Sequence, residues 1–338
     1  MRVYLLPPFM LGRYFQALAV YLSEELEVKE YRVDYLEVED ESFYEAIEEL
    51  ANKADQHLNK VKASIPLFGN DYRHFFPKVL GPDYKERFQT NKERLLGAAK
   101  KLAELESTNA SHLSILKATM FKHVKSFLAA KDERKLSEIQ DPKGEALALL
   151  GLALSVLGQV GDFTTMLLPP LPEELRELPE VALGIRSRYE LLEGLSLNKY
   201  KLDKLPCSSE LLLQFLIANE FRKGVEEGRI NLNCYAPNDV LTIAAVGGGN
   251  RALVYSVTPI LASELLCSLT RDLVRDLVRS LGQRPELACA CMNDAFLYAT
   301  SKNPVHLYDC ARRCAEEEDA RVRALVNKIK KITKEAVV

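Results

Sequence analysis

The sequence predicts an α+β protein in two parts, and three observations predict it. Short β-rich segments alternate with helical spacing near the N-terminus, long basic helical segments follow, and the second half is mainly helical. We therefore expect an N-terminal mixed α/β layer with long basic helices, and a C-terminal mainly helical part with a β-hairpin. A chain of 338 residues is long enough for two domains, which we place at residues 1–165 and 166–338.

The N-terminal layer is predicted from changes of period along the first sixty residues. Val3–Leu6 reads as a short strand, and Phe9–Leu26 carries its large apolar residues at helical spacing. Glu27–Val38 alternates apolar and polar residues, which favours a second strand. Glu41–Lys62 then reads as a strongly acidic helix.

The middle of the chain begins with a segment rich in turn formers, Ser64–Pro82. Two long basic helices are expected at Asp83–Glu106 and Ala110–Ala130. Gly144–Val160 reads as an apolar, buried helix, because it is shorter than the roughly 20 residues that cross a bilayer.

The second half begins after a proline-rich stretch, Leu168–Pro172, which is the best candidate linker. Val181–Tyr189 is predicted as a strand. Two β-rich runs, Val240–Val246 and Ala252–Val257, are joined by Gly247–Asn250, which favours a hairpin over a phosphate-binding loop. The remaining predicted elements are the helices Ser208–Glu227, Ile260–Leu281 and Val305–Lys334.

Charge is segregated along the chain, although the net charge is only -3. Tyr21–Leu50 holds twelve acidic and two basic residues, whereas Tyr72–Lys135 holds fourteen basic and seven acidic ones. The tail Arg321–Lys334 has six basic residues and no acid. Separated charge of this kind indicates binding to polyanions or to charged protein partners. The acidic helix is then a candidate docking face for a basic subunit.

The segment Phe68–Lys78 is the first candidate site, because amide and basic groups stand among aromatic residues. Such side chains can contact bases and phosphates, and an aromatic ring, that of Tyr72 or Phe75, can act as a wedge between bases. The following helices would extend a phosphate-binding track. The predicted nucleic-acid-binding residues are Asn70, Tyr72, Arg73, His74, Lys78, Lys122, Lys125 and Lys131. The alternative is an ordinary structured loop beside a solvated helix face.

The seven cysteines are predicted to be reduced thiols, since Met1–Pro8 does not resemble a signal peptide. We therefore expect a cytoplasmic protein with no membrane partner. Buried, apolar packing is the simplest role for the C-terminal thiols, and we assign no metal. Whether a zinc ion binds one set stays open: Cys289, Cys291, His306 and Cys310.

The sequence contains no nucleophile elbow, no Walker lysine and no recognisable pairing of histidine with aspartate. We therefore expect a binding protein, with no enzymatic activity and no cofactor. Two alternatives remain open, namely a scaffold that binds only protein and a metal-dependent nuclease whose carboxylates follow no known motif.

Two stretches, Pro66–Lys78 and Gly228–Tyr255, give the chain a resemblance to a known family. With its α/β start, basic aromatic segment and helical remainder, the chain resembles the large subunit of an archaeal type I-A CRISPR interference complex (Cascade). The resemblance implies a non-catalytic subunit beside crRNA and the other Cascade subunits. Such a subunit recognises the protospacer-adjacent motif in double-stranded target DNA, aids unwinding and recruits a helicase–nuclease.

Overall fold

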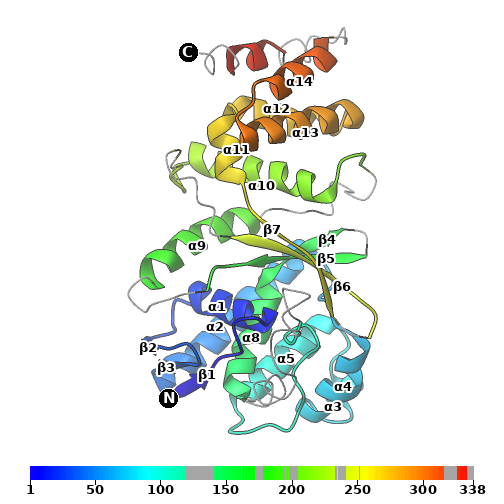
Figure 1. Ribbon diagram of the computed structural model, residues 1–338. Coiled ribbons are helices and arrows are strands. Elements are labelled where there is room, and N and C mark those ends of the chain that lie inside the picture. The colour runs from blue at the N-terminus through cyan, green and yellow to red at the C-terminus, as the bar shows by residue number, and fades with distance from the viewer. Residues whose placement is uncertain are drawn as a thin grey trace. The chain divides into compact units, whose positions relative to one another are not determined.

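The computed structural model describes residues 1–118, 141–160, 162–171, 178–193, 195, 197, 205–232, 234, 241–250, 252–315 and 326–332. The chain divides into two compact units (Figure 1). Unit 1 comprises Met1–Tyr189 and Leu241–Thr258, and unit 2 comprises Glu190–Val240 and Pro259–Val338. The division therefore differs from the expected boundary at residue 165, because the first unit continues to Tyr189 and a later hairpin returns to it. The predicted α+β class is confirmed.

Unit 1 begins with a three-stranded antiparallel sheet in the order β1 (Arg2–Tyr4), β3 (Tyr35–Val38) and β2 (Val28–Tyr31). Val3 of β1 pairs with Leu36 of β3, and both side chains are fully buried. The single strand predicted over Glu27–Val38 is thus two strands joined by a tight turn. Alternation continues through such a turn, so the periodicity did not reveal it.

Four helices form the core of unit 1: α1 (Leu11–Leu22), α2 (Asp40–Val61), α5 (Asn91–Ala103) and α8 (Pro142–Ser155). Helix α8 is apolar on all sides and packs against the other three. Such a helix belongs in the middle of a core rather than at its surface. The apolar run predicted as one helix to Val160 in fact ends as a helix at Ser155 and continues as strand β4.

The second sheet of unit 1 has the order β4 (Val156–Val160), β5 (Phe163–Leu168), β6 (Thr242–Gly247) and β7 (Leu253–Pro259). Strands β5 and β6 are antiparallel, with Thr164 opposite Val246. The predicted hairpin β6–β7 is confirmed as a pair of neighbouring strands. It extends the sheet of unit 1, however, and is not part of the C-terminal helical domain (Figure 1).

Unit 2 is built from helices in its described part: α10 (Ser209–Glu226), α11 (Ala262–Ser268), α12 (Arg271–Ser280), α13 (Pro285–Ser301) and α14 (Val305–Ala315). Side chains cap two of them, because the Ser208 hydroxyl accepts from the Leu211 amide and the Thr270 hydroxyl from the Leu273 amide, each at 3.2 Å. Such caps satisfy amides that have no partner inside the helix.

Further predicted elements are wrong, among them Asp83–Glu106 and Ile260–Leu281, which were each expected as one helix and are each interrupted. Val181–Tyr189, predicted as a strand, lies within helix α9 (Leu178–Glu193). The helix predicted from Ala110 does not begin there, since residues 110–118 are irregular and turn-like, and the rest of it lies outside the described residues. Among the helices described, none is both long and apolar enough to span a bilayer.

Candidate nucleic-acid interface

The candidate segment is helical rather than a loop. Asp71–Phe75 forms a single π-helical turn, η1, which continues as α3 (Phe76–Val79) and is followed by α4 (Tyr84–Arg87). The Asp71 side chain is 1% exposed and holds the segment in place. Its carboxylate accepts hydrogen bonds from the backbone amides of Phe68 at 2.8 Å and Ser114 at 2.7 Å.

The aromatic side chains of this segment pack inward. Phe75 and Phe76 are fully buried, and Phe76 stacks on Tyr84 with ring centroids 5.7 Å apart. Tyr72 is half-buried, and its hydroxyl donates to Asn91 at 2.9 Å. The suggestion that Phe75 acts as a wedge is therefore wrong, because the ring belongs to the core. The composition of a segment does not indicate whether an aromatic ring points toward the core or toward solvent.

The basic side chains of the same segment point outward. The basic face is defined by five exposed residues, Arg73, His74, Lys78, Lys85 and Arg87. Exposed acids also occur there, at Asp83 and Glu86, so the face is mixed with a basic excess. The structure thus brings three of the predicted residues, Arg73, His74 and Lys78, onto one short stretch, with Asn70 half-buried before them.

The part of the predicted track that lies on α5 is largely neutralised. Lys92 of α5 lies 2.6 Å from Asp55 of α2, and Lys100 lies 2.5 Å from Glu48. Lys101 pairs with Glu104 at 3.0 Å. Helix α2 was proposed from the sequence as a docking face for a basic partner. Two of its acidic side chains instead pair with lysines of α5 in the same molecule. The predicted residues Lys122, Lys125 and Lys131 lie outside the described residues.

The glycine-rich turn of the β6–β7 hairpin meets the start of the basic segment. The Gly69 amide donates to the Gly249 carbonyl at 3.4 Å, and a Cβ at Gly69 would lie 2.7 Å from the Asn250 side-chain oxygen. Segments about 180 residues apart in sequence thus touch. Gly248 has φ +134°, a conformation that favours glycine.

An exposed aromatic pair that the sequence reading missed lies near this turn. Phe163 of β5 and Tyr255 of β7 are in contact, with ring centroids 4.5 Å apart. Phe163 is 36% and Tyr255 54% exposed. Both residues stand in β-rich runs, but only the sheet order brings β5 and β7 to either side of β6.

Four cysteines of unit 2 form two disulfides, which corrects the prediction of reduced thiols at those four positions. Cys207 bonds to Cys289 and Cys234 to Cys267, with Cα–Cα distances of 5.1 and 5.4 Å. Cys289 is therefore not a thiolate ligand, and the zinc set suggested by the sequence does not form. In the described part of the chain, no group of three His, Cys, Asp or Glu side chains is placed to hold a metal ion.

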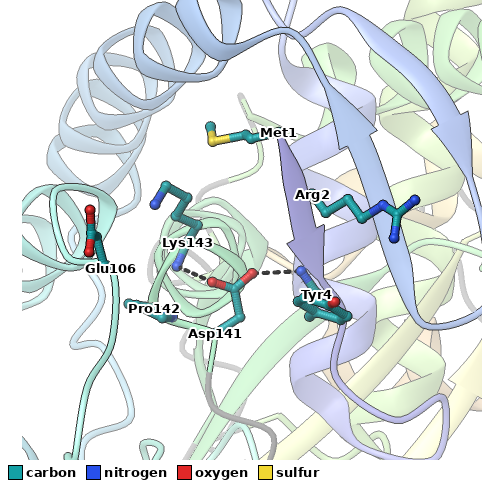
Figure 2. Close-up of a pocket in the computed structure, with 7 residues that line it drawn as sticks. All are labelled: Met1, Arg2, Tyr4, Glu106, Asp141, Pro142 and Lys143. Carbon is teal, nitrogen blue, oxygen red and sulfur yellow. Dashed lines mark hydrogen bonds between the residues drawn. The ribbon is translucent and has the colours of Figure 1, made fainter.

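A pocket of about 360 Å³ opens between β1 and the start of α8 (Figure 2). Asp141 lies in its wall and accepts from the amides of Tyr4 at 2.6 Å and Lys143 at 3.1 Å. Burial raises the pKa of Asp141, although these hydrogen bonds oppose the shift. Glu106 and Lys143 add opposite charges to the lining. Because the carboxylate joins β1 to α8, its evident role is structural.

The sequence matches no protein-family model, and comparison with curated proteins gives no match. The resemblance to a Cascade large subunit therefore stays a prediction.

Proposed function

We propose that the basic face binds the phosphate backbone of a nucleic acid, and that the chain acts as a non-catalytic, nucleic-acid-binding subunit. One observation carries this proposal: the cations of η1, α3 and α4 are exposed, whereas Lys92, Lys100 and Lys101 of α5 have acidic partners. Lysine and arginine bind phosphates by releasing condensed counterions. Only cations that are not already paired gain fully from this release.

The architecture of the segment supports the same proposal. Asp71 and the buried phenylalanines fix its backbone, so Arg73, Lys78 and Arg87 project from a rigid base. A rigid base lowers the entropy that these side chains lose when they contact a ligand. The basic face is small, which suits one subunit of a larger assembly better than a protein that binds DNA by itself.

The resemblance supplies the finer form of the proposal. In that form the chain is the large subunit of a type I-A CRISPR complex, and works in the cytoplasm with crRNA and the other Cascade subunits. It recognises the protospacer-adjacent motif in double-stranded DNA, aids unwinding and recruits a helicase–nuclease. The two disulfides are compatible with this form, because intracellular proteins of hyperthermophilic archaea are often rich in them.

The test is the binding of labelled duplex DNA at increasing salt by the full chain. The variant Arg73→Gln/Lys78→Gln/Arg87→Gln should bind more weakly, and the dependence of log K on log salt should fall by about one unit per cation removed. The control Arg271→Gln/Arg279→Gln/Lys331→Gln removes three exposed charges from unit 2 and should bind as the unaltered protein does. Equal losses of affinity in both variants would show that binding depends only on net charge, which would contradict the proposal.

The neutralised lysines of α5 favour one alternative, a scaffold that contacts only protein. In that case the charges on α2 and α5 only pair with one another, and the basic face meets an acidic subunit. The same titration decides between the two, since a scaffold binds neither DNA nor RNA even at low salt.

A further inference from the structure

The Phe163–Tyr255 pair has an unusual position for aromatic side chains in a sheet. Both rings are substantially exposed, and Leu253, two residues before Tyr255 on the same face of β7, is 55% exposed. The three side chains form an apolar patch at one end of the sheet. We name this patch the aromatic platform.

Gly247 explains how the two rings meet. In the β5–β6 register Thr164 pairs with Val246, so Gly247 is next to Phe163. A Cβ at Gly247 would lie 3.0 Å from the Phe163 ring and 3.3 Å from the Tyr255 ring. The absence of a side chain on the middle strand thus lets rings from its two neighbours come together.

The aromatic platform is close to the basic face along the backbone. Gly247 is two residues from Gly249, which accepts the hydrogen bond from Gly69, and Arg73 follows four residues later. With rises of roughly 3.3 Å per strand residue and 1.5 Å per helical residue, this path measures about 16 Å. Apolar rings and exposed cations therefore stand within the reach of one short ligand.

We propose that Phe163 and Tyr255 stack on an unpaired base of a single-stranded nucleic acid whose phosphates lie on the basic face. This inference rests on the proposed function and specifies its ligand. Every base offers a π-face, so stacking tolerates any sequence, and the adjacent cations attract the backbone. A duplex keeps its bases stacked on one another, so the aromatic platform selects single strands.

The absence of tryptophan from the chain makes a direct test possible. Tyr255→Trp places the only indole of the protein on the aromatic platform, and a bound base should quench its fluorescence. The probe is an oligothymidylate of about 12 nucleotides, which matches the usual site sizes of such proteins. Tyr308→Trp is the matched control, because Tyr308 of α14 is 52% exposed against 54% for Tyr255. Quenching is expected in the first variant only, and a duplex of equal length should cause little.

Affinities give the second measurement. Tyr255→Ser should weaken binding of the oligothymidylate about 5- to 100-fold, whereas Tyr255→Phe should retain it. Duplex binding should be unchanged in both variants. Circular dichroism checks that the serine variant is folded, and the tryptophan variant keeps an aromatic ring in any case.

The outcomes separate this inference from the proposed function. Salt-dependent binding without quenching would contradict base stacking on the aromatic platform, and so would normal binding of the single strand by the serine variant. Either result would leave the proposal for the basic face intact. If the unaltered chain binds neither probe, both proposals fail.

Discussion

The Lys92 ammonium group lies 2.6 Å from the Asp55 carboxylate, and this pair joins the basic helix α5 to the acidic helix α2. Lys100 and Glu48 repeat the connection farther along the same two helices. Charge that is segregated along the chain is thus partly recombined by packing. This relationship decides which cations remain for a ligand.

Removal of the acidic partners should uncover those lysines. Asp55→Asn/Glu48→Gln is expected to raise the affinity for duplex DNA at low salt by about two- to tenfold, because two cations become available to phosphates. Stability should change little, since exposed ion pairs contribute at most about 1 kcal/mol. Titrations against Glu210→Gln/Glu286→Gln, which makes the same net-charge change at exposed sites in unit 2, provide the control. An equal gain in the control would show that the position of the charge is irrelevant.

The close contact between α1 and α8 depends on a glycine. A Cβ at Gly151 would lie 1.8 Å from the Phe15 carbonyl oxygen, so Gly151→Ala must displace a helix backbone. We expect a loss of about 3 kcal/mol or more in the free energy of unfolding. Gly184 of α9 is the control, because its added Cβ would meet only the end of Arg188 at 3.4 Å. Gly184→Ala should be neutral or stabilise by up to about 1 kcal/mol, as measured by denaturant unfolding.

The Asp71 carboxylate is expected to hold the basic segment together. Asp71→Ala leaves the amides of Phe68 and Ser114 without their acceptor and should cost about 2–4 kcal/mol. Asp71→Asn keeps one side-chain oxygen and should cost less. Hydrogen exchange of those two amides measures the effect locally, and unchanged protection in the alanine variant would contradict the anchoring role.

Asp71 also predicts a dependence of stability on pH. Burial is the largest influence and raises its pKa, against the opposing hydrogen bonds and the charge of Lys117. The folded state then holds this proton to a higher pH than the unfolded chain does. Its contribution to stability is therefore greatest at acid pH, below the unfolded pKa, and declines as pH rises through the folded pKa. We would measure the unfolding free energy of the unaltered protein and of Asp71→Asn from acid to neutral pH. The difference between the two should decline with pH, and a rise would contradict a raised pKa for Asp71.

The disulfides of unit 2 bracket helix α10, because Cys207 precedes it and Cys234 follows it. Cross-links that close loops of this length typically stabilise by about 2–4 kcal/mol each. Cys207→Ser and Cys267→Ser should each lower the melting temperature of the full chain, and a reductant should have the same effect on the unaltered protein. Peptide mapping without reductant should find the pairs Cys207–Cys289 and Cys234–Cys267. Complete alkylation of all cysteines before reduction would contradict the pairing.

The sequence predicted elements well where a single period ran over a long segment. Helix α2 extends over Asp40–Val61, against Glu41–Lys62 expected, because its buried residues recur every three to four positions. Helix α9 was mistaken for a strand, since nine residues were too short a window. Ala182, Ile185, Tyr189 and Leu192 are all buried at helical spacing, and the last of them lies beyond the nine-residue window. Likewise, an apolar run has no period, so the change from α8 to β4 at Val156 was not visible.

Local sequence by itself determined the α+β class, the hairpin at Gly247–Asn250 and the outward cations Arg73, His74 and Lys78, because these depend on propensity and polarity over a few residues. Only the tertiary structure decided which charges stay unpaired, which cysteines bond and which aromatic rings meet. Those outcomes depend on contacts between segments far apart in the chain, and such contacts are fixed by packing and sheet order rather than by any local pattern.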